Sequence, residues 1–246
     1  MQKSLVAFCD LDGTFVQTAR HVAEGVSTQL VYTSETNKSI VITDKQLKLY
    51  EALLQIGHVI PVTARSLESV GRLLSTLTYP THKICNHGVY IYDEENRLIP
   101  RYTTSLIGLA SDKQYSMRQI LDQLGRICNG NSVFEDLRFK PMMYQQYILC
   151  IEISALTDFH ARMIEKAIKL RKHSGIIVSR NGKGISVTCE VESYKQIACQ
   201  YLLENYPEYQ GLPTLGFGDS ISDLPFMQGC DFSVIPNNTG TQIQVG

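Results

Sequence analysis

Short apolar segments alternate with segments of helical periodicity at both ends of this chain, and this alternation restricts its fold more than any other feature. Segments 5–9, 59–62 and 83–85 are short and largely apolar, as expected of strands that are buried on both faces of a parallel sheet. Between them, segments 43–57 and 66–77 place leucines at helical spacing. Thr43 and Gln46 match a capping box, and Gly57 marks the expected end of the first helix. The pattern predicts an α/β fold with an open, doubly wound parallel sheet and helices on its faces.

Two segments interrupt this alternation. Within residues 15–43, the apolar stretches 29–32 and 39–42 flank a polar stretch, which predicts a hairpin that we call the flap. Residues 99–189 predict a helix at 111–128, a strand at 147–153, a helix at 158–172, and a hairpin at 176–187 that turns at Asn181 and Gly182. In the second of these helices, the face expected to be buried carries Phe159, Met163, Ala167 and Leu170.

After residue 190 the alternation resumes, with a helix at 194–205, a strand at 214–217, a short helix after 223 and a strand at 232–235. The sequence therefore predicts two domains. Residues 1–98 together with 190–246 form the core, and residues 99–189 form an inserted α+β cap.

Composition and charge argue against several classes of protein. The 246 residues contain 23 Lys and Arg against 24 Asp and Glu, so the basic surplus of a nucleic-acid-binding protein is missing. The apolar runs are far shorter than the roughly 20 residues of a membrane span, and the N-terminal segment does not resemble a signal peptide. Seven scattered cysteines without a C-x-x-C pair indicate reduced thiols and a cytoplasmic protein rather than a zinc site. We expect no nucleic-acid or membrane partner.

Reactive side chains follow three of the predicted strands. Asp10 and Asp12 follow the first strand, Thr63 follows the second, and Asp219 and Asp223 follow the strand at 214–217. Because ligands of open α/β sheets bind beyond the carboxyl ends of the strands, we expect these residues to meet on one edge. A group of carboxylates without cysteine suits Mg²⁺, which leaves room for a phosphate, and Gly13 allows close approach of the backbone.

The same residues carry a resemblance to a known family. The segment FCDLDGT at 8–14 resembles the first motif of the haloacid dehalogenase-like (HAD) phosphatases, and Thr63 within VTAR is similar to the second. Lys195 lies where the lysine of the third motif is expected, and GDSISD at 218–223 resembles the fourth. The insert resembles the C2 cap of the subgroup that contains Cof-type, sucrose-phosphate and mannosyl-3-phosphoglycerate phosphatases. The chain departs from its relatives at Ala64 and at His87, where they commonly have Gly, and the rival Lys183 lies at a predicted hairpin tip.

The resemblance implies a mechanism. Asp10 attacks phosphorus to form an aspartyl-phosphate, and Asp12 first protonates the leaving oxygen and then deprotonates water. Thr63 and Lys195 bind the transferred phosphoryl group. The metal ligands would be the side chains of Asp10, Asp219 and Asp223 and the backbone carbonyl of Asp12. The implied activity is a Mg²⁺-dependent phosphatase for a small phosphorylated metabolite, for which we expect a sugar phosphate selected by the cap. A sugar phosphomutase and a non-catalytic ligand-binding module remain alternatives.

Overall fold

The structure, a computed structural model, describes residues 3–34, 37–73, 76–130, 137–189 and 193–237. It divides into two compact units. Met1–Ile99 and Ser193–Gly246 make up the first, which we call the core unit, and Pro100–Glu192 make up the inserted unit.

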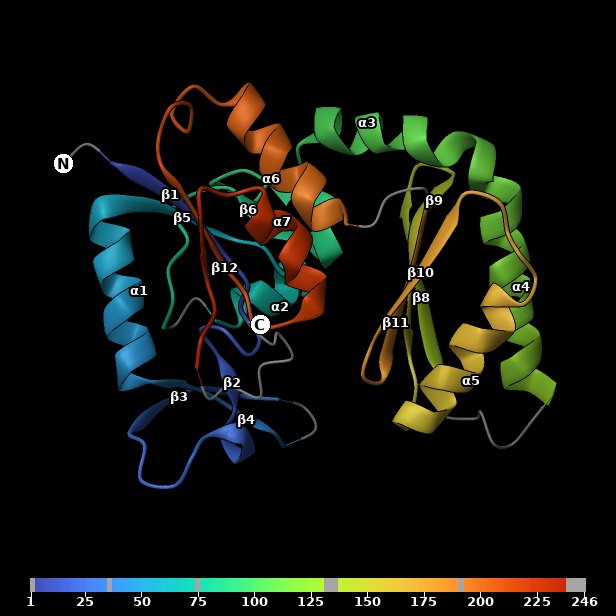
Figure 1. Cartoon of the computed structure of the whole chain (residues 1–246), viewed down its shortest axis with the longest axis horizontal. Helices are drawn as coiled ribbons and strands as arrows, with labels where there is room; N and C mark the ends of the chain where they lie inside the picture. The colour runs from blue at the N-terminus through green and yellow to red at the C-terminus, as the bar shows by residue number, and fades with distance from the viewer. Residues whose placement is uncertain (1–2, 35–36, 74–75, 131–136, 190–192, 238–246) are drawn as a thin grey trace. The chain divides into compact units, whose positions relative to one another are not determined.

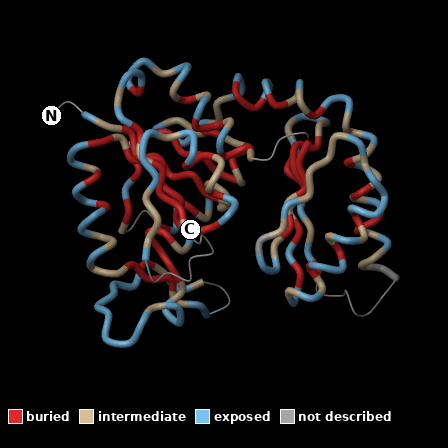
Figure 2. Tube along the Cα trace, viewed as in Figure 1, coloured by how far each residue is buried: buried red, intermediate tan, exposed pale blue. Residues whose placement is uncertain are grey.

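A parallel sheet of four strands in the order β13-β12-β1-β5 lies at the centre of the core unit. The strands are β1 (Leu5–Cys9), β5 (Gly57–Pro61), β12 (Thr214–Phe217) and β13 (Phe232–Val234). Beyond β5, a parallel bridge between Val62 and Ile84 adds β6 (Lys83–Cys85), which pairs with β7 (Tyr90–Tyr92). The last four residues of β1 are fully buried, and Figure 2 shows the buried interior running through this sheet. The predicted parallel sheet is confirmed.

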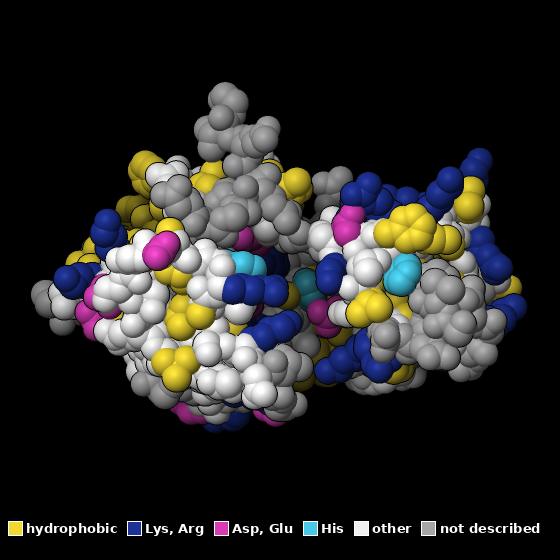
Figure 3. All heavy atoms as spheres, turned by 90° about the horizontal axis from the view of Figure 1, so that it is seen from below, with side chains coloured by type: hydrophobic (Ala, Val, Ile, Leu, Met, Phe, Trp, Pro, Cys, Tyr) yellow, Lys and Arg dark blue, Asp and Glu magenta, His cyan; other side chains and the backbone are white. Residues whose placement is uncertain are grey.

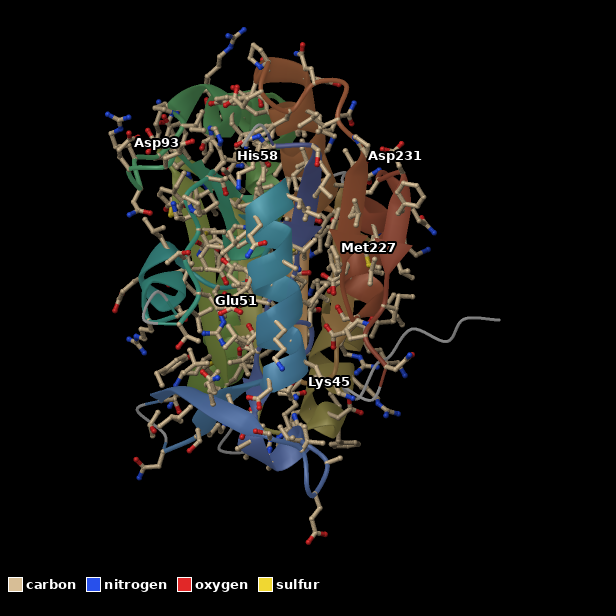
Figure 4. All side chains as sticks on the ribbon, turned by 90° about the vertical axis from the view of Figure 1, so that its left-hand side faces the viewer. Lys45, Glu51, His58, Asp93, Met227 and Asp231 are labelled. Atoms are coloured by element: carbon tan, nitrogen blue, oxygen red, sulfur yellow. The ribbon has the colours of Figure 1, made fainter. Side chains whose placement is uncertain are left out.

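Helices cover both faces of this sheet. The helix α1 (Asp44–Ile56) lies on one side, while α6 (Tyr194–Asn205) and α7 (Leu224–Gln228) lie on the other (Figure 1). Figure 4 shows the same arrangement with α1, marked by Glu51, nearest the viewer and Met227 on α7 farther back. The capping box of α1 is present, with Thr43 Oγ1 accepting from the Gln46 amide and Gln46 Oε1 accepting from the Thr43 amide. The predicted start of α1 is therefore confirmed.

The predicted end of one helix is confirmed and that of another is wrong. Helix α1 ends at Ile56 with Gly57 as its C-cap, and the Gly57 amide donates to the Leu53 carbonyl. The backbone of Gly57 is extended rather than left-handed, and a Cβ there would lie 2.3 Å from Leu5 Cδ1, so close packing also favours glycine at this position. The helix expected at 66–77 is the shorter α2 (Leu67–Gly71), and the expected contact of Leu74 lies outside the described residues.

The flap is a three-stranded antiparallel sheet in the order β2-β4-β3. Its strands are β2 (Gln17–Thr18), β3 (Thr28–Thr33) and β4 (Ser39–Thr43), and a 3₁₀ turn, η1 (Ala19–His21), follows β2. The predicted hairpin is confirmed as β3 and β4. A bulge between Leu30 and Tyr32 interrupts their pairing, so that Leu30 pairs with Val41 while Tyr32 pairs with Ile40.

The inserted unit is an antiparallel sheet in the order β10-β11-β9-β8 with helices packed against it (Figure 1). Its strands are β8 (Arg138–Tyr144), β9 (Tyr147–Ser154), β10 (Ile176–Asn181) and β11 (Gly184–Cys189). Its helical elements are α3 (Pro100–Ala110), η3 (Ser111–Lys113), α4 (Gln114–Gly130) and α5 (Asp158–Lys169). The sequence predicts all of these except α3 and β8.

The buried face of α5 differs from the prediction. Phe159, Met163 and Leu170 are 65%, 46% and 70% exposed, and the residues that are buried instead are Ala161, Ile164 and Ile168. Asp158 and Glu165 lie next to this buried face, where both form ion pairs with Arg180 on β10. In Figure 3, hydrophobic side chains of this unit lie exposed among lysines and arginines.

All seven cysteines have free thiols. None of the helices in the described part of the chain has the length and apolar character that a membrane crossing requires.

Candidate active site

The predicted site residues follow three adjacent parallel strands. Asp10 comes directly after β1, Asp219 comes two residues after β12, and Thr63 comes two residues after β5. The Asp10 amide donates to the carbonyl oxygen of Phe217 at 2.8 Å, which joins the ends of the two central strands. These residues therefore share the carboxyl edge of the sheet, as the sequence predicted.

Three carboxylates form a cluster at this edge. One oxygen each from Asp10, Asp219 and Asp223 lies within 4.8 Å of the others. Asp223 ends the 3₁₀ turn η5 (Ile221–Asp223), where its Oδ2 accepts from the amide and hydroxyl of Ser220 at 3.1 and 2.6 Å. Asp223 is 1% exposed, so these bonds fix its carboxylate within the protein.

Lys195, in the first turn of α6, lies against this cluster. Its ammonium donates to Asp10 Oδ1 at 2.8 Å and to Asp223 Oδ1 at 2.6 Å, and its side chain is 6% exposed. A Cβ on Gly88 would lie 2.3 Å from the backbone nitrogen of Lys195, so the turn η2 (Asn86–Gly88) packs directly against the start of α6. The structure therefore places Lys195 beside Asp10 and Asp223 at the carboxyl edge of the sheet.

The cluster carries more negative than positive charge. If all three carboxyl groups are ionised, one ammonium leaves two uncompensated negative charges in a largely buried space. Burial raises the pKa of Asp10 well above its ordinary range, and Asp223 raises it further while Lys195 opposes the shift. Burial also raises the pKa of Asp219, to about 6. Although burial favours loss of its proton, Asp10 and Asp223 raise the pKa of Lys195 above its ordinary value.

The donor set and the local backbone fit a magnesium ion. All three clustered side chains offer carboxylate oxygens, which Mg²⁺ prefers, and a divalent cation would balance the two excess negative charges. Gly13 has φ of +88°, and a Cβ there would lie 2.2 Å from Asp219 Oδ2. Only glycine lets the loop after β1 approach Asp219 this closely, as the sequence predicted.

Asp12 lies outside the carboxylate cluster. Its side chain is 52% exposed and forms a bidentate pair with Arg65, with Nε to Oδ2 at 2.7 Å and Nη2 to Oδ1 at 2.5 Å. Thr63 is 1% exposed, and its hydroxyl accepts from the Arg65 amide at 3.1 Å. Although burial opposes it, the carboxylate of Asp12 raises the pKa of Arg65, so this guanidinium keeps its charge.

Arg65 was not among the predicted site residues. The available signal was its position in the segment VTAR, two residues after Thr63, at the same sheet edge as Asp12. The sequence could not show that the guanidinium turns back toward Asp12, because 53 residues separate the two.

His87 and Lys183 were the other residues singled out in the sequence. His87 lies in η2 with φ of +58°, next to Asn86 at +52°, and its amide donates to the Thr63 carbonyl at 3.0 Å. Consecutive non-glycine residues in the left-handed region are strained, and such strain is concentrated near functional sites. Lys183 lies in the two-residue turn between β10 and β11, which confirms that it belongs to a hairpin tip.

Comparison with solved structures finds proteins of the same architecture. A haloacid dehalogenase-like hydrolase from Bacillus subtilis aligns over 98% of this chain and 97% of its own, with a TM-score of 0.51 and 14% identity. This chain has the HAD-like fold. The sucrose-phosphatase of Synechocystis, solved with sucrose and phosphate, aligns over 96% of this chain and 84% of its own, with a TM-score of 0.56 and 18% identity.

A third protein with this fold is the C-terminal domain of Candida albicans trehalose-6-phosphate phosphatase. It aligns over 92% of this chain and 73% of its own, with a TM-score of 0.57 and 12% identity. No family model and no curated protein sequence matches the chain. The resemblance expected from the four motifs is therefore confirmed for the fold, including an inserted unit of the C2 type, at identities too low to show more.

Proposed function

We propose that this HAD-like chain is a Mg²⁺-dependent phosphatase that hydrolyses a small phosphorylated metabolite, a sugar phosphate, through an aspartyl-phosphate on Asp10. One observation supports this most directly. Three carboxylates and the ammonium of Lys195 converge within hydrogen-bonding and metal-binding distances at the carboxyl edge of a parallel sheet.

In this proposal Asp10 is the nucleophile. Lys195 engages Oδ1 of Asp10, which leaves Oδ2 to attack phosphorus. The new O–P bond forms as the bond from phosphorus to the substrate oxygen breaks, and Asp12 gives that oxygen a proton. Water then attacks the aspartyl-phosphate, Asp12 takes a proton from this water, and inorganic phosphate leaves with Asp10 restored.

The other site residues bind and orient in this proposal. Asp10, Asp219, Asp223 and the backbone carbonyl of Asp12 would hold Mg²⁺, which when bound screens the repulsion between an anionic nucleophile and an anionic phosphate. Thr63 and Lys195 would bind the phosphoryl oxygens. Because Arg65 occupies both oxygens of Asp12, Asp12 must release at least one of these contacts to carry a proton.

Two considerations support a sugar phosphate and a selecting role for the inserted unit. The similar Synechocystis enzyme was solved with sucrose and phosphate. An α+β unit of residues 100–192 is also larger than a connection between two core elements requires. We therefore assign substrate selection to this unit, as part of the proposal.

The test is phosphate release from a panel of sugar phosphates and one aryl phosphate, with Mg²⁺ and after chelation. Asp10→Asn keeps the shape of the side chain but removes the nucleophile, so we expect a loss of about a thousandfold or more in kcat. Asp112→Asn, at a surface aspartate of the inserted unit, is the matched control and should leave kcat unchanged.

Activity of Asp10→Asn within about tenfold of wild type would contradict the role of Asp10. Isomerisation of a sugar phosphate without phosphate release would indicate a phosphomutase, and binding without turnover would indicate a ligand-binding module.

A further inference from the structure

Tyr32 on β3 of the flap contacts Arg65, the residue that pairs with Asp12. Its hydroxyl accepts a hydrogen bond from Arg65 Nη1 at 2.7 Å, and the Arg65 guanidinium carbon lies 5.7 Å from the centre of the Tyr32 ring. Both contacts involve the guanidinium that holds Asp12. A hydrogen bond and a cation–π contact from one residue fix the position of this group more strongly than either would alone.

The bulge in β3 gives Tyr32 this orientation. Residues 30 and 32 of a regular strand face the same side, but here they pair with the consecutive residues Val41 and Ile40, whose side chains face opposite sides. Leu30 is accordingly 60% exposed, whereas Tyr32 is half-buried and packs against the buried hydrophobic residues of the core unit. Bulges are frequent next to active sites, where they redirect a side chain.

The donors of Arg65 are divided between Asp12 and the residues that hold Arg65. Nε and Nη2 donate to the carboxylate of Asp12, while Nη1 donates to the Tyr32 hydroxyl at 2.7 Å and to Ser69 Oγ at a longer 3.3 Å. The arginine side chain has four rotatable bonds, so two contacts on Nη1 set the plane in which Nε and Nη2 face Asp12. When Asp12 releases a contact to carry a proton, Tyr32 and Ser69 still hold Arg65 in place.

We propose that Tyr32 is a positioning residue for proton transfer, because it holds Arg65 in the orientation that aims Asp12 at the leaving oxygen. This inference rests on the proposed phosphatase function and adds a role for the flap. Tyr32 acts through Arg65 and does not itself contact the reacting atoms. A role in packing alone would require the ring of Tyr32 but not its hydroxyl.

The experiment measures kcat/KM of Tyr32→Phe on aryl phosphates whose phenols range from strongly to weakly acidic. The kcat/KM value reports the step in which the phenol leaves, and only a weakly acidic phenol needs a proton at that point. We expect little change for the most acidic phenol, and a loss of about tenfold for the least acidic phenol and for sugar phosphates. The dependence of log kcat/KM on phenol pKa becomes steeper than in wild type.

Three further variants sharpen the result. Leu30→Ala removes more atoms from the same strand than Tyr32→Phe does, at an exposed side chain, and leaves the contacts of Arg65 intact. This variant should keep the wild-type dependence of log kcat/KM on phenol pKa. Arg65→Lys should steepen the dependence as Tyr32→Phe does, because lysine cannot hold Asp12 in a bidentate pair. Adding Tyr32→Phe to Arg65→Lys should then have no further effect, since both changes break the same contact.

A wild-type dependence in Tyr32→Phe, or equal losses for all leaving groups, overturns the inference. Partial unfolding cannot imitate the expected result, because a smaller active fraction lowers every rate by the same factor. If the wild-type protein releases no phosphate, or if Asp10→Asn stays active, the proposed function itself fails. If the wild-type protein is active and needs Asp10, a negative result at Tyr32 removes only this inference.

Discussion

Replacing Lys195 by methionine tests the charge arrangement of the site. The substitution keeps a long apolar stem and removes the ammonium that bonds Asp10 and Asp223 at 2.8 and 2.6 Å in a position 6% exposed. Removing one partner of a buried ion pair costs about 3–5 kcal/mol, because the remaining charge stays buried without compensation. We expect a loss of this size in the free energy of unfolding of the metal-free protein at pH 7.

The loss should depend on pH in a stated direction. Without the ammonium, the folded Lys195→Met protein keeps a proton on one more carboxyl group of the cluster than the wild-type protein does. The unfolded chain has lost this proton at the same pH. Stability then falls as pH rises, by about 1.4 kcal/mol per pH unit for each such carboxyl. Between pH 5 and pH 7 the deficit relative to wild type should therefore grow by about 2.7 kcal/mol. Lys195 itself contributes nothing to this trend, since its raised pKa keeps it charged throughout the range.

Urea unfolding at several pH values measures the effect, and Lys83→Met provides the matched control. Lys83 is also a buried lysine, 2% exposed, but within the described residues the acceptors of its ammonium are the backbone carbonyls of Thr81, Asp93 and Glu94. Its removal leaves no buried carboxylate unpaired, so its deficit should not grow between pH 5 and pH 7. Saturating Mg²⁺ should restore part of the stability of Lys195→Met and none of that of Lys83→Met. A deficit for Lys195→Met that is independent of both pH and Mg²⁺ would refute the reasoning.

Three other predictions follow from the same geometry. Gly13→Ala should weaken Mg²⁺ binding at least about tenfold, because a Cβ at this position would lie 2.2 Å from Asp219 Oδ2. The control is Gly25→Ala, which has a similar φ but nothing within 4 Å of the added Cβ, and which should keep the wild-type affinity. Equal affinities of the two variants in titration calorimetry would contradict this prediction. Asp219 must lose a proton to bind Mg²⁺, and its pKa is raised to about 6, so the affinity for Mg²⁺ should rise as pH increases through 6. Equal affinities at pH 5 and pH 8 would exclude Asp219 as a ligand. Replacing residues 100–192 by a Gly-Ser linker should reduce kcat/KM more for the best sugar phosphate than for a small aryl phosphate, and equal losses would rule out a selecting role for the inserted unit.

The elements that the sequence predicted best are those fixed by local chemistry. The Thr43 and Gln46 capping box lies within four residues, and both of its hydrogen bonds form as expected. The helix expected at 194–205 has those bounds, and its cap is the side chain of Ser193. Buried strands such as β1 are readable because every residue must be apolar when both faces are covered.

Predictions failed where two readings were equally consistent with the local pattern. Helix α5 has two apolar rows at helical spacing, and its packing against the sheet, which buries Ala161, Ile164 and Ile168, is not encoded in the spacing. Strand β8 was missed because its segment, RFKPMMY, has Met142 as its one buried residue, so it carries little apolar alternation. Gly57 ends α1 as the sequence predicts, but its close packing against Leu5 joins residues 52 positions apart and cannot be read from the local pattern.

The sequence by itself determined which chemical groups this protein can use. The aspartates, Thr63 and the glycine at 13 follow predicted strands, and parallel strands all end at one edge of a sheet, so their meeting place follows from topology alone. Only the tertiary structure decided which charges share that space. Lys195 reaches Asp10 from 185 residues away, and Arg65 reaches Asp12 from 53 residues away while a bulge turns Tyr32 toward it. Such pairings depend on side-chain directions and burial across separate elements, and no periodicity within a single segment encodes them.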